Sequence, residues 1–151
     1  MRVVLQRVSR AELSVDEAKK AFIGSGALLL VGVEERDIGV DYKKLVEKIL
    51  SLRIFPAIDG SSSFDRSIRE VQGELLIVSQ FTLFADIRKG RRPSFNRALS
   101  PDVAKKEFER VVEQFKESYE ADKVFQGVFG AYMEVTLCND GPVTLVIDYP
   151  W

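Results

Sequence analysis

The stretch from Leu75 to Ala85 constrains the fold of this chain more than any other. Leu75 to Val78 form a continuous apolar run, which is typical of a strand buried on both faces. Three polar side chains follow, at Ser79, Gln80 and Thr82. An unpaired buried hydroxyl or amide costs roughly 1 to 3 kcal/mol, so these groups either bind nearby backbone or face a ligand. Polar residues close many strands by bonding backbone, and this stretch alone leaves both interpretations open.

A second apolar run and two helical patterns accompany this strand. Ala27 to Val33 predict a central strand beside Leu75 to Val78. Residues 37–52 predict one helix, and residues from Ser100 to about Tyr119 predict a second. We interpret the apolar faces of both helices as core; they comprise Leu45, Val46, Ile49, Leu50 and Leu52, and Ala104, Phe108, Val111, Val112, Phe115 and Tyr119.

The start of the second helix carries several recognisable signals. Ser100 can cap the free N–H groups, Pro101 suits the first helical position, and Asp102 favours the positive end of the helix dipole. We therefore expect Ser100 to be the capping residue.

Short strands are predicted near both ends of the chain. They cover residues 2–8, 11–15, 123–129, 132–138 and 143–148. Ser9-Arg10 is predicted to join the first two strands, and Asn139-Asp140-Gly141-Pro142 the last two, as turns. The order of elements is strands, helix, strand, helix, strands, which is not the strict alternation of a doubly wound fold. It predicts one α+β domain over residues 1–151, with a mixed sheet covered on one face by two helices.

The sequence contains no histidine, and this absence excludes several kinds of chemistry. It excludes Ser-His-Asp and Cys-His catalysis, the His-Glu-x-x-His zinc site, and a histidine general base. The single cysteine, Cys138, excludes an intramolecular disulfide and a cysteine-rich zinc site, which agrees with a reducing compartment. Carboxylates, lysines, hydroxyls, backbone N–H groups, a metal held by oxygen ligands, or groups of the substrate itself remain available.

Composition indicates an ordinary globular protein. Hydrophobic residues make up 46% and charged residues 30% of the 151 residues. No apolar run approaches the roughly 18 residues that span a membrane, and the N-terminal residues predict a strand rather than a signal peptide. We therefore expect a cytoplasmic protein. A net charge of -1 does not give the whole molecule a basic field, although a local basic patch remains possible.

A local basic patch is in fact present between the central strand and the second helix. Arg88, Lys89, Arg91 and Arg92 surround Gly90, and an aromatic residue follows shortly after. This composition suits a flexible loop that meets phosphates. The alternative is a solvated loop, and charge alone does not decide between the two.

Four motifs in the same order make the chain similar to a known family. They are Ser79-Gln80-Phe81-Thr82-Leu83, Lys89-Gly90-Arg91-Arg92-Pro93-Ser94-Phe95, Gly127-Val128-Phe129-Gly130-Ala131-Tyr132-Met133 and Asn139-Asp140-Gly141-Pro142-Val143-Thr144. With these motifs the chain resembles the D-aminoacyl-tRNA deacylases, from Arg2 at its start to Asp148 near its end. It departs from the family at Phe64-Asp65, where Met-Asn is usual.

The resemblance implies a hydrolase that cleaves the ester joining a D-amino acid to the terminal adenosine of tRNA, and that also accepts glycine esters. It implies a homodimer with a mostly antiparallel, barrel-like sheet, active sites at the subunit interface, and no cofactor or metal. Gly141-Pro142 would be a Gly-cisPro element that enters the partner's site and excludes L-amino acids, with Arg7 orienting it. The remaining implied site residues are Ser79, Gln80, Phe81 and Thr82 for catalysis, Met133 for substrate binding, and Lys89, Arg91 and Arg92 for tRNA binding.

Two versions of the reaction remain open. Backbone N–H groups of Gln80, Phe81 and Thr82 would polarise the ester carbonyl in both. Either the Thr82 hydroxyl participates directly, or the ribose 2′-hydroxyl of the substrate orients the attacking water. We favour the second version, because the sequence offers no evident base for activating a threonine.

Two other kinds of function compete with the deacylase. One is a non-catalytic tRNA-binding module that grips tRNA through the basic loop. The other is an interaction protein whose Tyr149-Pro150-Trp151 tail docks a partner, unless that tail packs on its own subunit.

Overall fold

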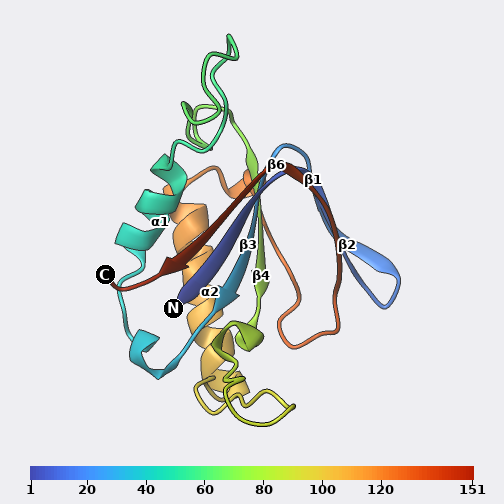
Figure 1. Ribbon diagram of the computed structural model, residues 1–151, viewed down its shortest axis with the longest axis vertical. Helices are drawn as coiled ribbons and strands as arrows, with labels where there is room; N and C mark the ends of the chain where they lie inside the picture. The colour runs from blue at the N-terminus through green and yellow to red at the C-terminus, as the bar shows by residue number, and fades with distance from the viewer.

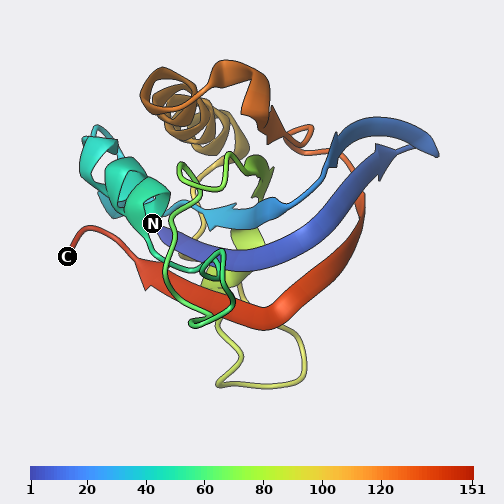
Figure 2. The same ribbon diagram turned by 90° about the horizontal axis from the view of Figure 1, so that it is seen from above.

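The computed structural model describes residues 1–151 as an α+β fold (Figure 1). In chain order its elements are β1 (Arg2–Val15), β2 (Ala18–Ile23), β3 (Gly26–Gly32), the 3-10 helix η1 (Glu35–Asp37), α1 (Lys43–Ser51), β4 (Glu74–Ser79), the 3-10 helix η2 (Phe81–Phe84), α2 (Pro101–Ser118), the 3-10 helix η3 (Ala121–Lys123), β5 (Val124–Gln126) and β6 (Glu134–Asp148). Figure 2 shows both α-helices on one side of a strongly curved sheet.

The sheet is mixed and nearly closed into a barrel. Its strand order is β2-β1-β3-β4-β5, and β6 pairs with β1. The pairs β3–β4 and β4–β5 are parallel, while all three pairs that involve β1, with β2, β3 and β6, are antiparallel. The predicted neighbours in the centre are confirmed, since Leu28 pairs with Leu76 and Leu30 with Val78. The predicted α+β class and the two helices on one face are also confirmed.

The core lies mainly between the helices and the sheet. α1 and α2 direct their predicted apolar faces against the central strands, where Leu29 and Ile77 are completely buried. A smaller cluster, which includes Leu28 and Leu76, lies on the other face of these strands. β3 and β4 are therefore buried on both faces, as their continuous apolar runs indicate.

Two predicted turns are wrong, because the chain continues through each as one strand. β1 runs unbroken from Arg2 to Val15, since β6 pairs along it on both sides of Ser9-Arg10. β6 likewise runs unbroken from Glu134 to Asp148. The chain also forms β2, which was not predicted; this edge strand exposes its charged residues and buries Ala21 and Ile23.

The helix boundaries differ from prediction at two points. α1 starts at Lys43 rather than near Asp37, because Asp37 is buried and accepts hydrogen bonds from the Met1 amino group and from the Glu34 N–H. α2 starts at Pro101 as predicted. Ser100 is its N-cap residue, as predicted, but the Ser100 side chain does not make the expected capping hydrogen bond.

Candidate active site

The turn after β4 presents free backbone donors. The strand ends at Ser79, and η2 follows immediately at Phe81. A short helix leaves its first N–H groups without internal partners, and the N–H groups of Phe81 and Thr82 donate to no acceptor within the chain. The Gln80 N–H, by contrast, donates to the Val31 carbonyl at 2.8 Å. The expected set of three free N–H groups is therefore reduced to two.

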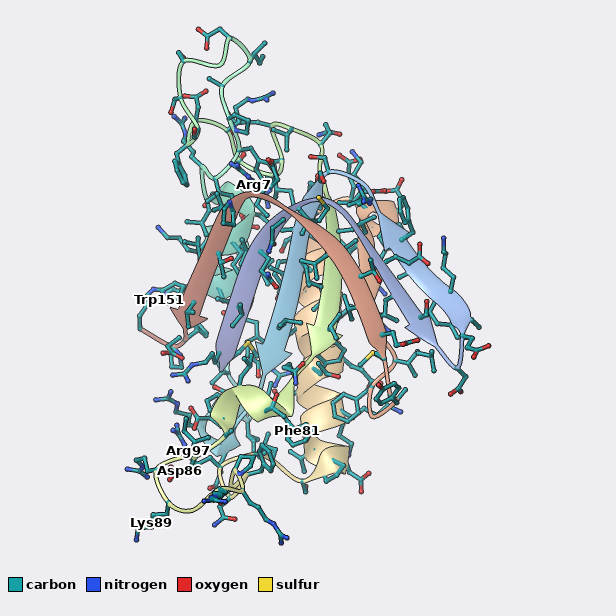
Figure 3. All side chains as sticks on the ribbon, turned by 45° about the vertical axis from the view of Figure 1, so that its right-hand side comes forward. Arg7, Phe81, Asp86, Lys89, Arg97 and Trp151 are labelled. Atoms are coloured by element: carbon teal, nitrogen blue, oxygen red, sulfur yellow. The ribbon has the colours of Figure 1, made fainter.

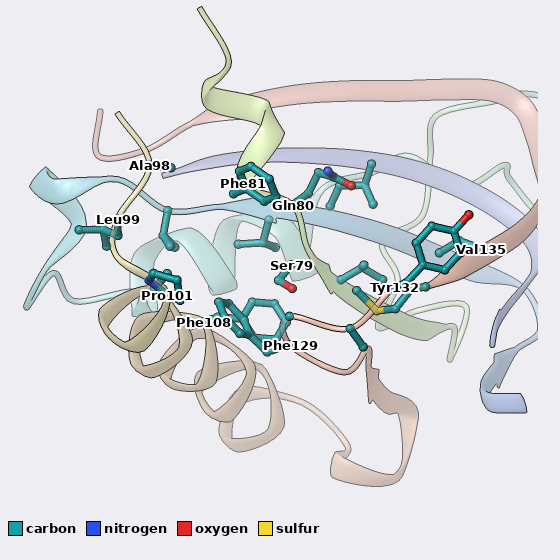
Figure 4. Close-up of a pocket in the computed structure, with 18 of the residues that line it drawn as sticks. Ser79, Gln80, Phe81, Ala98, Leu99, Pro101, Phe108, Phe129, Tyr132 and Val135 are labelled. Carbon is teal, nitrogen blue, oxygen red and sulfur yellow. The ribbon is translucent and has the colours of Figure 1, made fainter. Parts of the chain in front are cut away.

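The side chains of this turn are polar but not ionisable. Gln80 Nε2 donates to Thr82 Oγ1, and this is the hydrogen bond that the structure gives the threonine side chain. The Ser79 hydroxyl makes no hydrogen bond within the chain and points toward the adjacent cavity (Figure 4). No carboxylate or amine hydrogen-bonds either hydroxyl. The turn can donate hydrogen bonds to a substrate, but it lacks a base that would activate Thr82.

A cavity of about 720 Å³ opens beside this turn (Figure 4). Ser79, Gln80, Phe81 and Met133 line it, as do four aromatic residues that were not predicted for the site: Phe95, Phe108, Phe129 and Tyr132. Phe108 belongs to the apolar face of α2, so its helical spacing indicated only core. Phe129 and Tyr132 lie in a motif that the sequence does reveal. Thr82 is exposed and does not line the cavity.

Gly141-Pro142 forms a bulge in β6 rather than a hairpin turn. Gln6 pairs with Thr144 and Val8 with Asn139, so Arg7 alone faces the four residues Asp140–Val143. Gly141 has φ +126°, a conformation that favours glycine. The peptide bond before Pro142 is cis, and both residues of the dipeptide are exposed.

Arg7 holds this bulge from beneath. Its side chain is buried, and Nε donates to the Asp140 carbonyl at 3.0 Å. Its Nη1 donates to the carbonyls of Ile54 and Ser63, which lie at the two ends of the loop formed by residues 54–63. The unusual Phe64-Asp65 pair follows directly and is exposed. Arg7 thus joins the bulge and this loop into one unit.

The two groups of predicted site residues lie at opposite ends of the sheet. Ser79 pairs with Val31, and Val31 pairs with Val3, whereas the bulge lies opposite Arg7. The four-residue step along β1 from Val3 to Arg7 corresponds to about 13 Å. Figure 3 shows Arg7 at one end of the sheet and Phe81 at the other. A single chain therefore does not bring the bulge to the turn.

The basic loop lies next to the turn. Backbone hydrogen bonds in both directions between Asp86 and Ser94 close it, and Lys89, Arg91 and Arg92 are exposed without an ion-pair partner. Figure 3 shows Lys89 at its outer end. The fourth cation, Arg88, instead binds Asp86, with Nε 2.9 Å from Oδ1; this pairing holds the pKa of the Asp86 carboxyl well below its usual range.

An aromatic contact joins the loop to the cavity. The rings of Phe95 and Phe81 meet edge to face, with their centroids 5.0 Å apart. The loop and the turn thus form one continuous surface around the cavity mouth.

Two remaining features concern metals and the tail. No three or more His, Cys, Asp or Glu side chains gather closely enough to hold a metal ion. Tyr149 is buried and its hydroxyl donates to the Asp41 carbonyl at 2.8 Å, so Tyr149 anchors the tail on its own chain, while Pro150 is exposed. Trp151 remains exposed, with its ring edge to face with that of Tyr149.

None of the helices has the length and apolar character needed to cross a membrane.

The chain is similar to known proteins over nearly its whole length. The D-aminoacyl-tRNA deacylase of Rippkaea orientalis is 45% identical over 98% of this chain and 99% of its own. That of Thermosipho africanus is 49% identical over 98% of this chain and 97% of its own. A solved structure titled "c-Myc DNA Unwinding Element Binding Protein" covers both chains fully, with 36% identity and a TM-score of 0.92.

These similarities place the chain among the deacylases, which are hydrolases. Residues 4–148 match the family described as D-Tyr-tRNA(Tyr) deacylase, and the chain belongs to this family. A structure titled "Structural Analysis of a probable eukaryotic D-amino acid tRNA deacylase" shares the fold, with a TM-score of 0.82 at 22% identity.

Proposed function

We propose that this protein hydrolyses the ester bond of D-aminoacyl-tRNA in the cytoplasm, releasing the D-amino acid and tRNA, and that it does so as a homodimer. The observation that carries the proposal is the separation of the two halves of the site. The donor turn and the Gly141-Pro142 bulge belong to the same family motif set, yet within one chain they lie at opposite ends of the sheet. A second copy can bring its bulge to the turn of the first.

The donor turn supplies the catalytic half. Two free N–H groups, from Phe81 and Thr82, suit the negative charge that develops on the carbonyl oxygen of an ester under attack. Backbone dipoles fixed in place beside an apolar cavity stabilise that charge more than water does. Because an aminoacyl ester is already reactive, this stabilisation does not require a strong base.

The bulge supplies the chiral half. Carbonyl groups of the partner's Gly141 and Pro142 would hold the α-amino group of the substrate, and their backbone would fill the space into which an L side chain points. Exclusion is then steric, so D-amino acids with any side chain enter the site. Glycine has no side chain to exclude, and we expect its ester to be accepted. Arg7 fixes the backbone that performs this selection.

Water is the proposed nucleophile, and the ribose 2′-hydroxyl of the substrate orients it. In the protein, Thr82 Oγ1 accepts a hydrogen bond from Gln80 and contacts no basic group. We expect Thr82→Ala to keep kcat on D-tyrosyl-tRNA within about threefold, because no base activates this hydroxyl. Single-turnover hydrolysis measures the effect. A complete loss of hydrolysis with unaltered tRNA binding would instead make Thr82 a direct participant.

The basic loop is the proposed tRNA contact. Replacing Arg91 and Arg92 by Gln should weaken tRNA binding and reduce the slope of log K against log salt by about one to two units, because each phosphate contact releases counterions. Binding titrations at several salt concentrations measure this slope. A Lys43→Gln, Lys44→Gln variant, which removes two exposed charges from α1, is the matched control. Unaltered salt dependence in the arginine variant would place the tRNA elsewhere.

The decay of D-tyrosyl-tRNA and L-tyrosyl-tRNA, measured side by side with catalytic amounts of protein, tests the proposed function. We expect rapid loss of the D ester and decay of the L ester at the rate seen in buffer. If neither ester decays faster than in buffer while the tRNA is bound, the protein is a tRNA-binding module and not a deacylase.

A further inference from the structure

Arg2 connects the donor turn to the end of β6. Its Nε and Nη2 bind the two carboxylate oxygens of Asp148 at 2.8 and 3.0 Å, a bidentate arrangement that fixes the guanidinium plane. Its Nη1 donates to the Leu83 carbonyl at 3.3 Å. Leu83 lies in η2, so this bond reaches the carbonyl end of the turn whose opposite end carries the free N–H groups.

The turn is also confined by its packing. The Arg2 guanidinium lies 5.7 Å from the ring centroid of Phe84, which is buried in the same turn. Arg97 lies 5.3 Å from that ring and donates to Glu34 at 2.7 Å. Beneath the turn, a Cβ at Gly32 would lie only 3.0 Å from the Gln80 carbonyl oxygen. Packing therefore confines the turn near Gln80 and Phe84, and the Arg2 hydrogen bond adds a polar contact at its carbonyl end.

We propose that Arg2, fixed by Asp148, is a positioning residue that holds η2 so that the Phe81 and Thr82 N–H groups point at the reacting carbonyl. This inference rests on the proposed function. β1 then carries one arginine for each half of the site, with Arg7 holding the selecting bulge and Arg2 holding the donor turn. Arg2 touches neither substrate nor reacting atoms in this account; it acts through the backbone of Leu83.

Two measurements on Arg2→Gln test the proposal. The first is amide hydrogen exchange by NMR at Leu83 and Ala85, whose N–H groups bond within the turn; exchange there should become faster, with or without substrate. The second is steady-state hydrolysis of D-tyrosyl-tRNA, in which kcat should fall about tenfold or more while KM stays within about twofold.

A second carboxylate-held arginine provides the matched control. Arg69 also donates to both oxygens of a carboxylate, Glu47, and to a helix-end carbonyl, Ser118, with similar exposure but far from the turn. Arg69→Gln should leave the exchange at Leu83 and Ala85, and kcat, unaltered. Asp148→Asn should lower kcat by a smaller factor, and the double variant should be no slower than Arg2→Gln alone, because Asp148 acts through Arg2.

Unaltered amide exchange, or unaltered kcat, in Arg2→Gln would overturn the proposal. A rise of KM alone would also overturn it, since Arg2 would then be a tRNA contact. If the unaltered protein fails to hydrolyse the ester, the proposed function is contradicted, and the exchange measurement still decides whether Arg2 holds the turn.

Discussion

Gly141→Ala is expected to reduce hydrolysis of D-tyrosyl-tRNA by about 100-fold or more. Gly141 has φ +126°, and an added Cβ would lie 3.0 Å from both Val143 Cγ2 and Val143 N, and 3.1 Å from Arg7 Nη2. These contacts are tighter than most that real Cβ atoms make, and this φ strains any residue with a side chain, so we expect the substitution to displace the bulge. A misplacement of about 1 Å in groups that orient a substrate can cost about 10²-fold in rate. Initial rates of ester hydrolysis measure the loss.

Gly39→Ala is the control for the backbone cost alone. Gly39 also has a positive φ, +75°, but a Cβ there meets nothing within 4 Å, and it lies outside both halves of the site. We expect this variant to lose about 1 kcal/mol of stability and to keep its activity. Full activity in Gly141→Ala would show that the bulge does not contact the substrate.

Phe81→Pro is expected to lower kcat by about 10² to 10³, the usual effect of deleting one donor to an oxyanion. Proline lacks the N–H and is well tolerated at the first position of a helix, where that N–H has no internal partner. The preceding residue, Gln80, has φ -146° and ψ 82°, outside the α region that a following proline disfavours. The substitution therefore removes the donor with little strain on the turn.

Phe81→Ala separates the ring from the N–H. This variant loses the edge-to-face contact with Phe95 and part of the cavity wall, but it keeps the backbone donor. We expect it to retain at least about a tenth of the wild-type rate constant in single-turnover assays, because an exposed aromatic pair contributes only about 1 kcal/mol. Equal activities for the alanine and proline variants would remove the Phe81 N–H from the mechanism.

Local patterns predicted the buried parts of the fold well. The apolar runs of β3 and β4 and the apolar face of α2 each specify burial by their own composition. β1 and β6 were divided wrongly, because Ser9-Arg10 and Asn139-Asp140-Gly141-Pro142 have turn composition. Whether such a segment turns or continues depends on the strand paired beside it, which lies more than 100 residues away in the sequence.

The helix starts show the same dependence on distant contacts. Asp37 is a residue type that often begins a helix, but here it is buried and binds the Met1 amino group instead. The strand β2 was not predicted because it contains the charged residues Lys19 and Lys20. An edge strand can expose such residues, since only one of its faces is buried.

The site was predicted in parts rather than as a whole. Of the three polar residues at the end of β4, Ser79 and Gln80 line the cavity, whereas Thr82 is exposed and does not. The engagement of the Gln80 N–H by Val31 could not be foreseen, because it depends on the parallel pairing of β3 and β4. Phe108 belongs to the core, as predicted, and it also lines the cavity, which helical spacing alone does not reveal. That the donor turn and the Gly141-Pro142 bulge lie at opposite ends of the sheet follows only from the three-dimensional arrangement.

Mixed dimers test most directly the central claim that each site is built from two chains. Phe81→Pro and Gly141→Ala chains, each nearly inactive alone, would be unfolded together in a 1:1 ratio, refolded, and assayed on D-tyrosyl-tRNA. Half of the dimers would be heterodimers, in which one site carries both substitutions and the other carries neither, so we predict recovery of about a quarter of the wild-type activity. No recovery, with heterodimers demonstrated by mass spectrometry, would contradict the shared site.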